Sequence, residues 1–297
     1  MQKTERIEFT SLISAKLKDY AQLMKFRLSM LVVFSSGIGY LMGLTGAINW
    51  QGFIMICIGG MLTSGASNAL NQIIEKDFDR LMKRTANRPL PTERMTSIEA
   101  LLFAGILAVS GIGTLWIYFN EAAALLSAVA LLTYAFIYTP LKRFSPIAVY
   151  VGAIPGALPP MIGYVAATNL LNEQAALLFL IQFFWQLPHF WAIGWVAYDE
   201  YMRAGFKLLP STDGRSKASA MQTVFSVTVL IAVSVLPFAF GFTGFVSMLI
   251  VVAAGLIFLW QSIKLYRFCT VDAARQLMFG SFFYLPLVQL ALYFDKL

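Results

Sequence analysis

Cysteine, histidine and charge are all scarce in this chain of 297 residues. Its two cysteines are Cys57 and Cys269, and its one histidine is His189. Two widely separated cysteines give no disulfide framework and no paired metal-binding motif. Charged residues make up only 12% of the sequence, which is about half the share usual in a soluble domain. A disulfide-rich secreted protein, a Cys/His metal module and a separate soluble domain are therefore not expected.

Hydrophobic sequence is abundant instead, at 59% of the chain, in runs long enough to span a bilayer. These runs predict an all-α polytopic membrane protein, a bundle of nine transmembrane helices. The expected spans are about 28–44, 53–74, 101–119, 122–138, 147–167, 175–197, 224–242, 245–262 and 277–294. Residues 1–27 are expected to form a cytoplasmic N-terminal segment without a cleavable signal peptide, followed by one transmembrane domain over 28–297.

Basic residues predict the orientation of these spans. All 22 Lys and Arg residues except Lys296 fall before the first span or in the loops after even-numbered spans. By the positive-inside rule, the N-terminus is cytoplasmic and the C-terminus lies outside. The same loops account for the net charge of +7 and the pI near 9.4. This charge is expected to meet anionic lipid in the bilayer, and no nucleic-acid partner is expected.

The cytoplasmic end of the second span carries a dense group of carboxylates and basic residues. Four polar side chains fall within an arc of roughly 80° on a continuous helix: Asn68, Asn71, Glu75 and Asp79. Asp77 would point to the opposite side. If the helix ends near Glu75, all three carboxylates converge; otherwise Asp77 has a secondary role.

Oxygen ligands of this kind suit Mg²⁺, which keeps several waters and bridges to phosphate. The alternative is a solvated loop whose carboxylates pair with their basic neighbours Lys76, Arg80, Lys83 and Arg84. Because the polar stripe begins inside an apolar span, where solvation is poor, the sequence favours a binding site.

A second acidic group follows the sixth span. One helix face collects four polar side chains: Gln182, Gln186, His189 and Glu200. The predicted topology brings Asp199 and Glu200 to the same side of the membrane as the first group, so the two groups could hold two Mg²⁺ around one diphosphate. The alternative is a helix cap with an ion pair to Arg203.

Three further features are less specific indications of a binding site: one histidine, one pair of basic residues and one span rich in Gly and Pro. His189 suits buried polar packing between helices, axial ligation of haem, or a hydrogen bond to substrate. Lys142 and Arg143 could clamp phosphate or carboxylate, or only enforce topology. The fifth span contains several Gly and Pro residues between Gly152 and Gly163, which favours a helix that lines a cavity.

Five ordered blocks carry a family resemblance. The most specific is Asn71-x-x-x-Glu75-x-Asp77-x-Asp79-x-x-Met82-x-Arg84-Thr85-x-x-Arg88-Pro89. The others are Leu141-Lys142-Arg143, Gly156-Ala157-Leu158-Pro159-Pro160, Trp185-Gln186-x-Pro188-His189-Phe190 and Glu200-Tyr201-x-x-Ala204-Gly205-x-x-x-Leu209-Pro210. With these blocks the chain resembles the UbiA superfamily of intramembrane prenyltransferases over nearly its whole length, and within it the branch that acts on haem. It departs from the usual pattern at Glu75, where Asp is usual, and at Phe26, where Pro is usual.

The resemblance implies a nine-helix prenyltransferase that moves a farnesyl group from farnesyl diphosphate to a vinyl group of haem B. Mg²⁺ and basic residues would neutralise the departing diphosphate, the vinyl carbon would attack the allylic cation, and water would quench the new cation. The implied metal ligands are Asn71, Glu75, Asp79, Asp199 and Glu200, with Asp77 added to the catalytic set. The implied substrate-binding residues are Asn68, Arg84, Arg88, Lys142, Arg143, Gln186, His189 and Arg203.

Two rival functions use the same features. A sister prenyltransferase acting on 4-hydroxybenzoate or a quinone precursor would share the diphosphate site, although the Pro188-His189-Phe190 block argues against it. A cation transporter would instead hold its carboxylates near the middle of the bilayer. The resemblance implies a bacterial inner membrane protein with its active site facing the cytoplasm, and it leaves room for haem A synthase or terminal oxidase assembly as a downstream partner.

Overall fold

Nine helices in the described part of the chain are long and apolar enough to cross a membrane. This computed structural model describes residues 2–297, with side chains from residue 13 onward. The nine spans are α2 (Phe26–Gly43), α3 (Trp50–Ile74), α5 (Ser97–Tyr118), α6 to α7 (Glu121–Leu141), α8 (Ala148–Thr168), α9 (Glu173–Val196), α11 (Lys217–Ala239), α12 (Phe245–Phe268) and α13 (Val271–Phe294). The predicted all-α polytopic fold is confirmed.

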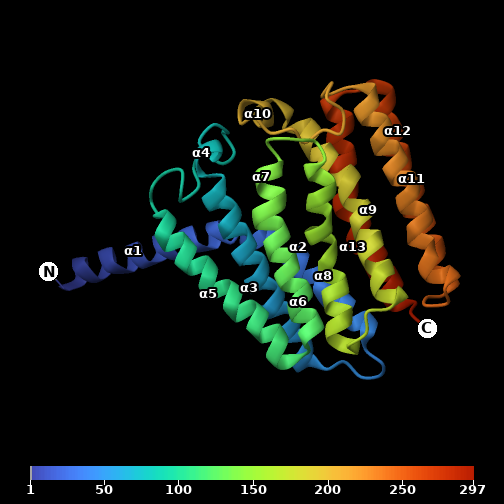
Figure 1. Cartoon of the computed structure of the whole chain (residues 1–297), viewed down its shortest axis with the longest axis horizontal. Helices are drawn as coiled ribbons and strands as arrows, with labels where there is room; N and C mark the ends of the chain where they lie inside the picture. Colours follow the sequence, from blue (N-terminus) through green and yellow to red (C-terminus); the bar gives the residue numbers. More distant parts are fainter. Residues whose placement is uncertain (1) are drawn as a thin grey trace.

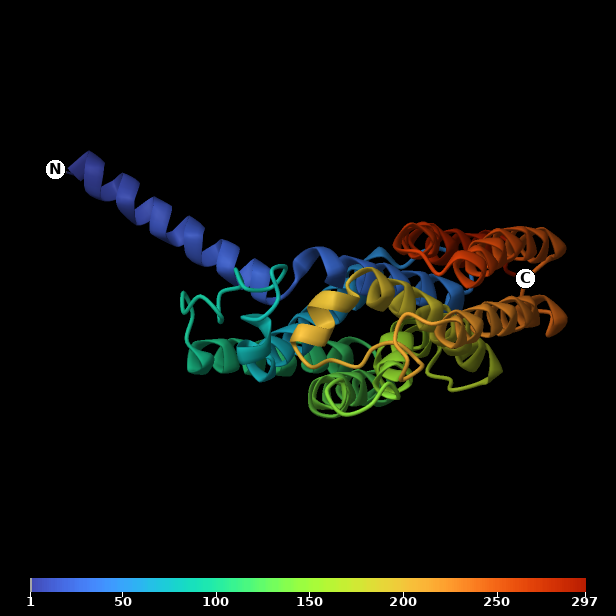
Figure 2. The ribbon, with the colours of Figure 1, turned by 90° about the horizontal axis from the view of Figure 1, so that it is seen from above.

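Shorter elements occupy the end of the bundle where the charged loops gather (Figure 1). They are α4 (Lys76–Asp79), the π-helix η1 (Thr133–Tyr138), α7 (Thr139–Leu141) and α10 (Tyr198–Arg203). Helix α1 (Gln2–Leu23) is as long as a span and projects sideways from the bundle (Figure 1). Seen from above, α10 and the segment around α4 lie over the same end of the bundle (Figure 2). The chain's C-terminus lies at the opposite end (Figure 1).

Polar caps fix where most of the spans begin, because a side-chain oxygen satisfies a backbone N–H that has no partner within the helix. The capping residues are Asn49, Thr96, Asn120, Asn172, Ser216 and Thr270. Two of them explain why α11 and α13 begin earlier than hydropathy predicts. Ser216 and Thr270 start these helices in polar sequence, before the apolar run that marks the membrane span.

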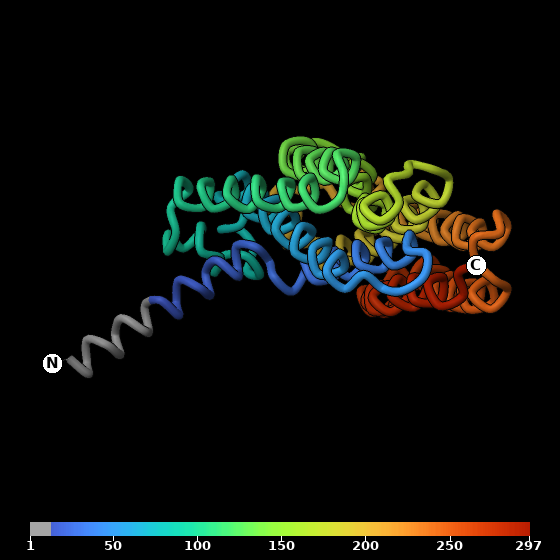
Figure 3. The backbone as a smooth tube through the Cα atoms, turned by 90° about the horizontal axis from the view of Figure 1, so that it is seen from below, coloured from blue at the N-terminus to red at the C-terminus, as the bar shows by residue number. Residues whose placement is uncertain are grey.

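Glycines allow α2 and α8 to pack backbone against backbone near the centre of the bundle. Figure 3 shows α2 running between α8 and α13. Helices α2 and α8 share one of the largest interfaces in the bundle. A Cβ on Gly163 would collide with the carbonyl oxygen of Ser36, and one on Gly39 would collide with that of Pro160. Small residues permit this close approach, which supplies the packing that holds membrane helices together.

Gly163→Ala is therefore expected to lower the free energy of unfolding by about 1–3 kcal/mol, because the added methyl group has to push two helix backbones apart. Gly105→Ala is the matched control, since Gly105 lies in α5 with nothing within 4 Å of an added Cβ. Thermal unfolding in detergent should show a lower midpoint for the first variant and an equal or higher one for the second. Equal midpoints for both variants would contradict the packing argument.

The C-terminus is fastened to the end of α2 by Lys296, the one basic residue predicted to lie outside. Its Nζ donates to the carbonyl oxygens of Leu41 and Leu44, both at 2.7 Å. Asp295 accepts a hydrogen bond from the backbone N–H of Ser247 at 2.6 Å. Lys296 thus hydrogen-bonds to the C-terminal end of α2, at the end of the bundle opposite α4 and α10.

The orientation in the membrane is open to a labelling test. In a background lacking Cys57 and Cys269, cysteines at Arg80 and Thr212 should resist a membrane-impermeant maleimide in intact cells, because both positions lie at the end predicted to be cytoplasmic. A cysteine at Leu171, in the loop at the opposite end, should be labelled under the same conditions. Labelling of the first two and protection of the third would reverse the orientation.

Candidate active site

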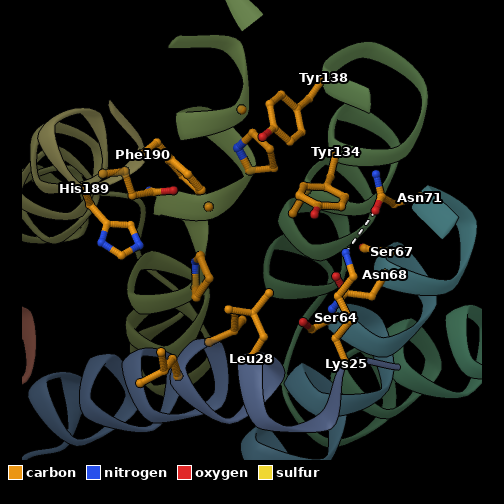
Figure 4. A pocket seen from close by; sticks show the side chains of 18 of the residues that line it. Lys25, Leu28, Ser64, Ser67, Asn68, Asn71, Tyr134, Tyr138, His189 and Phe190 are labelled. Carbon is orange, nitrogen blue, oxygen red and sulfur yellow. Dashed lines mark hydrogen bonds between the residues drawn. The ribbon is translucent and has the colours of Figure 1, made fainter. Parts of the chain in front are cut away.

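A cavity of about 390 Å³ lies inside the bundle and reaches the end that carries α4 and α10. Helices α2, α3, α8, α9 and α13 and the π-helix η1 contribute its walls, and Arg84, Tyr201 and Phe206 lie at its charged end. Farther in, the walls are mostly apolar. Figure 4 shows His189 and Phe190 on one side of the pocket and Lys25 and Asn71 across from them. Such a pocket suits a ligand with a charged head and a long apolar body.

A helix break at Glu75 shapes the charged end. Helix α3 ends at Ile74, Glu75 has φ −96° and ψ 7°, and α4 starts at Lys76. Asn71, Glu75 and Asp79 are all buried and line the pocket. Asp77 does not join them, because its side chain is 84% exposed and lies 4.0 Å from Arg80. The helix therefore ends where one alternative requires, yet the third carboxylate still points outward.

Each of the two buried carboxylates is paired with a basic residue predicted to bind substrate. Arg88 Nη1 donates to Asp79 Oδ2 at 2.7 Å. Lys142 Nζ forms an ion pair with Glu75 Oε1 at 2.5 Å, although the angles of this contact do not meet those of a hydrogen bond. Asp79 Oδ1 is buried and has no hydrogen-bond partner among the described residues. Burial raises the pKa of Asp79, while the charge of Arg88 acts in the opposite direction. The pairs keep the acid and base groups of the site in contact with each other.

Lys25 joins this cluster from the turn between α1 and α2, where its φ of 49° is left-handed. Its Nζ donates to Asn71 Oδ1 at 3.0 Å (Figure 4), and Asn71 Nδ2 donates to Thr139 Oγ1 at 3.0 Å. Burial, together with the nearby positive charge of Arg88, lowers the pKa of Lys25 to about 7. Asn68 has a packing role as well, since its amide donates to the carbonyl of Met24 and to the hydroxyl of Ser29.

The second acidic group does not reach the pocket in this structure, so the meeting of the two acidic groups around one ligand stays a prediction. Helix α9 ends at Val196, and a break at Ala197 starts α10 in a new direction, so Glu200 does not continue the polar face. The Asp199 side chain is 69% exposed and pairs with Arg215 at 3.2 Å. Neither residue lines the pocket. No group of three His, Cys, Asp or Glu residues in the described chain comes close enough to hold a metal ion.

Two predicted basic residues also lie off the pocket. Arg143 is exposed, with its guanidinium 4.2 Å from the centre of the Phe78 ring. Arg203 is exposed on α10. Arg84 does line the pocket, and its Nη2 donates to the Tyr201 hydroxyl at 3.1 Å. These contacts tie the segment after α3 to α10, and a small apolar cluster of Met82, Ala204 and Phe206 completes the junction.

The predicted polar face of α9 is present up to His189. Gln182, Gln186 and His189 are buried and line the pocket. Gln182 donates to the carbonyl of Gly156 at 2.8 Å, which anchors α9 to α8. His189 Nδ1 lies 2.7 Å from Ser281 Oγ on α13. Helix α8 remains continuous through its prolines and lines the cavity, as its Gly and Pro content predicted.

Sequence reasoning missed several residues that the fold brings to the pocket. Tyr134 and Tyr138 project from η1 with ring centroids 5.3 Å apart, and Lys142 Nζ lies 4.7 Å from the centre of the Tyr138 ring. No local signal marks a π-helix turn, although such turns are frequent at functional sites. Gly152 is an indirect sign that an aromatic ring packs here, because a Cβ added at Gly152 would lie 2.5 Å from the Tyr138 ring.

The first acidic group fits Mg²⁺ by its chemistry. Asn71, Glu75 and Asp79 offer hard oxygen ligands, and the free Oδ1 of Asp79 is a buried acceptor without a donor. Lys25, Arg88 and Lys142 stand beside them and suit phosphate oxygens. The fold and pocket thus define an integral membrane protein with a cluster of carboxylates and basic side chains at the end of an apolar cavity.

The sequence profile of the UbiA prenyltransferase family matches residues 32–285, and the chain belongs to that family. The protoheme IX farnesyltransferase of Cytophaga hutchinsonii is 45% identical over 285 residues, covering 96% of this chain and 100% of that protein. That of Flavobacterium psychrophilum is 45% identical over 292 residues, covering 96% of each. The predicted superfamily and branch are confirmed by these relatives.

Solved structures agree on the fold. A digeranylgeranylglyceryl phosphate synthase superposes with a TM-score of 0.78 at 19% identity, over 95% of this chain and 98% of the other. A UbiA homologue from Archaeoglobus fulgidus, bound to DMAPP and Mg²⁺, gives 0.69 at 14% identity, over 92% of this chain and 99% of the other.

Proposed function

We propose that the protein transfers a farnesyl group from farnesyl diphosphate to a vinyl group of haem B, giving haem O and diphosphate. The observation that carries this proposal is the near full-length identity of 43–45% to proteins named protoheme IX farnesyltransferase. The pocket supports it, because a charged end for diphosphate continues into an apolar cavity for the prenyl chain.

The charged end is proposed to bind the diphosphate. Arg88 and Lys142 would leave their carboxylate partners and donate to phosphate oxygens, and Lys25 would add a third cation. Asn71, Glu75 and Asp79 would hold Mg²⁺, which supplies positive charge to the leaving diphosphate. The basic side chains add to this neutralisation, so the bond between C1 of farnesyl and oxygen can break to give an allylic cation.

The walls of the cavity are proposed to guide that cation to the acceptor. Tyr134 and Tyr138 face the pocket between the charged end and the apolar part, and aromatic ring faces attract cations. His189 and Phe190 lie across the pocket, on the side proposed for haem (Figure 4). The vinyl carbon of haem would attack C1 of the farnesyl cation from there. Arg84 at the mouth is a candidate partner for a haem propionate.

A direct test incubates the purified protein in detergent or vesicles with haem B, farnesyl diphosphate and Mg²⁺, and identifies the products by mass spectrometry. We expect a porphyrin carrying one farnesyl group and one added water, with turnover lost on addition of a chelator and restored by Mg²⁺. The sister activity is tested in parallel with 4-hydroxybenzoate as acceptor. Prenylation of that acceptor, with haem left unmodified, would overturn the proposal.

The proposed site also has a proposed place in the cell. The carboxylates and basic residues of the pocket lie at the end of the bundle where the basic loops gather, so the active site is expected to open to the cytoplasmic face of a bacterial inner membrane. Asp199 and Glu200 remain candidates for a second Mg²⁺, which would require α10 to turn toward the pocket. A downstream partner in haem A synthase or oxidase assembly is compatible with this location.

A further inference from the structure

We propose, building on the function above, that His189 and Gln186 hold and deprotonate the water molecule that completes the reaction, with Ser281 as the residue that sets His189 in the required tautomer. The proposal rests on two buried contacts that α9 makes with α8 and α13, and on one hydrogen bond of Ser281 within α13. Each contact restricts which atom of His189 or Gln186 faces the pocket.

The hydrogen bonds of Ser281 determine the tautomer of His189. Ser281 Oγ lies 2.5 Å from the carbonyl oxygen of Met278, which can only accept, so the single hydroxyl proton is donated there. At its 2.7 Å contact with His189 Nδ1, the same oxygen must therefore accept. Nδ1 then carries the proton of the neutral imidazole, and Nε2 carries a free electron pair.

Aromatic side chains fix the imidazole ring of His189 at the wall of the pocket. His189 stacks on Trp185 with ring centroids 4.7 Å apart and an interplanar angle of 16°. Phe282 meets the imidazole edge on at 5.1 Å, and Trp185 is itself anchored by a 2.9 Å hydrogen bond to the carbonyl of Ser281. His189 lines the cavity, and within the described chain Nε2 makes no hydrogen bond. A fixed base that points into a cavity is suited to accept a proton.

Gln186 supplies a second acceptor one helical turn away. Its Nε2 donates to the carbonyls of Ala153 and Gln182, both at 3.2 Å. Both partners only accept, so the amide nitrogen must face them and Oε1 must face away. Oε1 lies against Gly156, where any Cβ would collide with it. Gln186 and His189 both line the pocket, and in the proposal Nε2 of His189 and Oε1 of Gln186 accept the two protons of one water molecule.

The chemistry needs such a water. Attack of the terminal vinyl carbon on C1 of the farnesyl cation forms the new carbon–carbon bond and leaves a cation on the vinyl carbon next to the porphyrin ring. The oxygen of water bonds to that carbon, one of its protons passes to Nε2 of His189, and the product is an alcohol. Without the water, the neighbouring CH₂ group loses a proton instead, and the product is an alkene that is lighter by one water molecule.

The ratio of alcohol to alkene, measured by mass spectrometry, tests the proposal in His189→Gln and Ser281→Ala. Glutamine at position 189 keeps a polar side chain but is a poor base. Ser281→Ala keeps the imidazole of His189 but removes the acceptor that holds the proton on Nδ1. We expect the ratio to fall at least about 10-fold in both, since a positioned base typically contributes 10²–10⁴-fold. Ser234→Ala is the matched control, because this buried serine on α11 bonds Tyr284 and does not line the pocket. Its ratio should equal that of the wild type.

Three outcomes would overturn the proposal. The first is an unchanged ratio in both variants. The second is an altered Soret band of bound haem in His189→Gln, which would make His189 an iron ligand. The third is loss of all farnesylated product in folded variants that still bind a non-hydrolysable farnesyl diphosphate analogue, since a base that acts after carbon–carbon bond formation is not needed for ionisation. If the wild type makes no farnesylated haem at all, the proposed function fails instead.

Discussion

Asp79→Asn is expected to lower kcat at least about 100-fold, because the leaving diphosphate loses a ligand for its neutralising Mg²⁺. The Asp79 side chain is 1% exposed, and its Oδ1 has no partner in the described chain. The substitution keeps the size of the side chain and an oxygen that can accept from Arg88, so the hydrogen bond of the pair is retained while its negative charge is lost. Single-turnover rates at saturating farnesyl diphosphate and a titration of Mg²⁺ give the measurement.

Asp77→Asn is the matched control, two residues away in the same motif. Its side chain is exposed and does not line the pocket, so we expect a much smaller loss of rate. The comparison tests whether activity depends on a side chain that faces the pocket or only on a place in the motif, because the sequence pattern predicts both residues to be catalytic. Equal losses in the two variants would mean that the segment around α4 rearranges in the working enzyme, and unchanged activity in Asp79→Asn would remove this residue from the metal site.

Lys142→Met is expected to lower the free energy of unfolding by about 3–5 kcal/mol, because it leaves the buried carboxylate of Glu75 without its ion-pair partner. Adding Glu75→Gln removes that charge and should restore most of the lost stability. Activity should not return, because both substitutions remove groups proposed for the diphosphate and metal site. The single and double variants therefore separate a stabilising role from a catalytic one.

The measurement combines unfolding in detergent with binding of a farnesyl diphosphate analogue. We expect the double variant to melt near the wild type and to bind the analogue weakly. Arg143→Met provides the matched control, because Arg143 follows Lys142 in the chain but is exposed on the Phe78 ring. A Lys142→Met variant as stable as the wild type would show that the buried pair makes no net contribution to the fold.

Sequence reasoning predicted the transmembrane helices well because the signal is local. Each span needs a continuous apolar run, and the bilayer requires that backbone groups be satisfied within the helix. All nine spans lie where hydropathy predicts them. Helices α11 and α13 begin earlier than predicted, at the polar caps Ser216 and Thr270, and α12 ends later, at Phe268. The family resemblance was also visible, because the motif blocks are contiguous in sequence.

Predictions about side chains on one helix face differ in outcome between the two helix breaks. The stripe of Asn71, Glu75 and Asp79 faces the pocket even though the helix breaks within it. On α9 the same reasoning holds as far as His189 and fails at Glu200, because the chain turns at Ala197. An extrapolation over 18 residues requires an unbroken helix, and the sequence gives no clear mark of this break.

The sequence by itself determined the class of membrane protein, the number of spans, the family and the composition of the charged end. Only the tertiary structure decided which charged groups meet: that Lys142 reaches Glu75, that Arg88 reaches Asp79, and that Asp199 turns to Arg215. It also decided that Ser281 on α13 faces His189 on α9, a contact across 92 residues. Hydropathy and motifs are local properties of the sequence, so they identify the spans and the residues suited to a ligand. Contacts between helices depend on packing, on helix breaks and on a π-helix turn. These features are set by the whole fold and cannot be read from one segment.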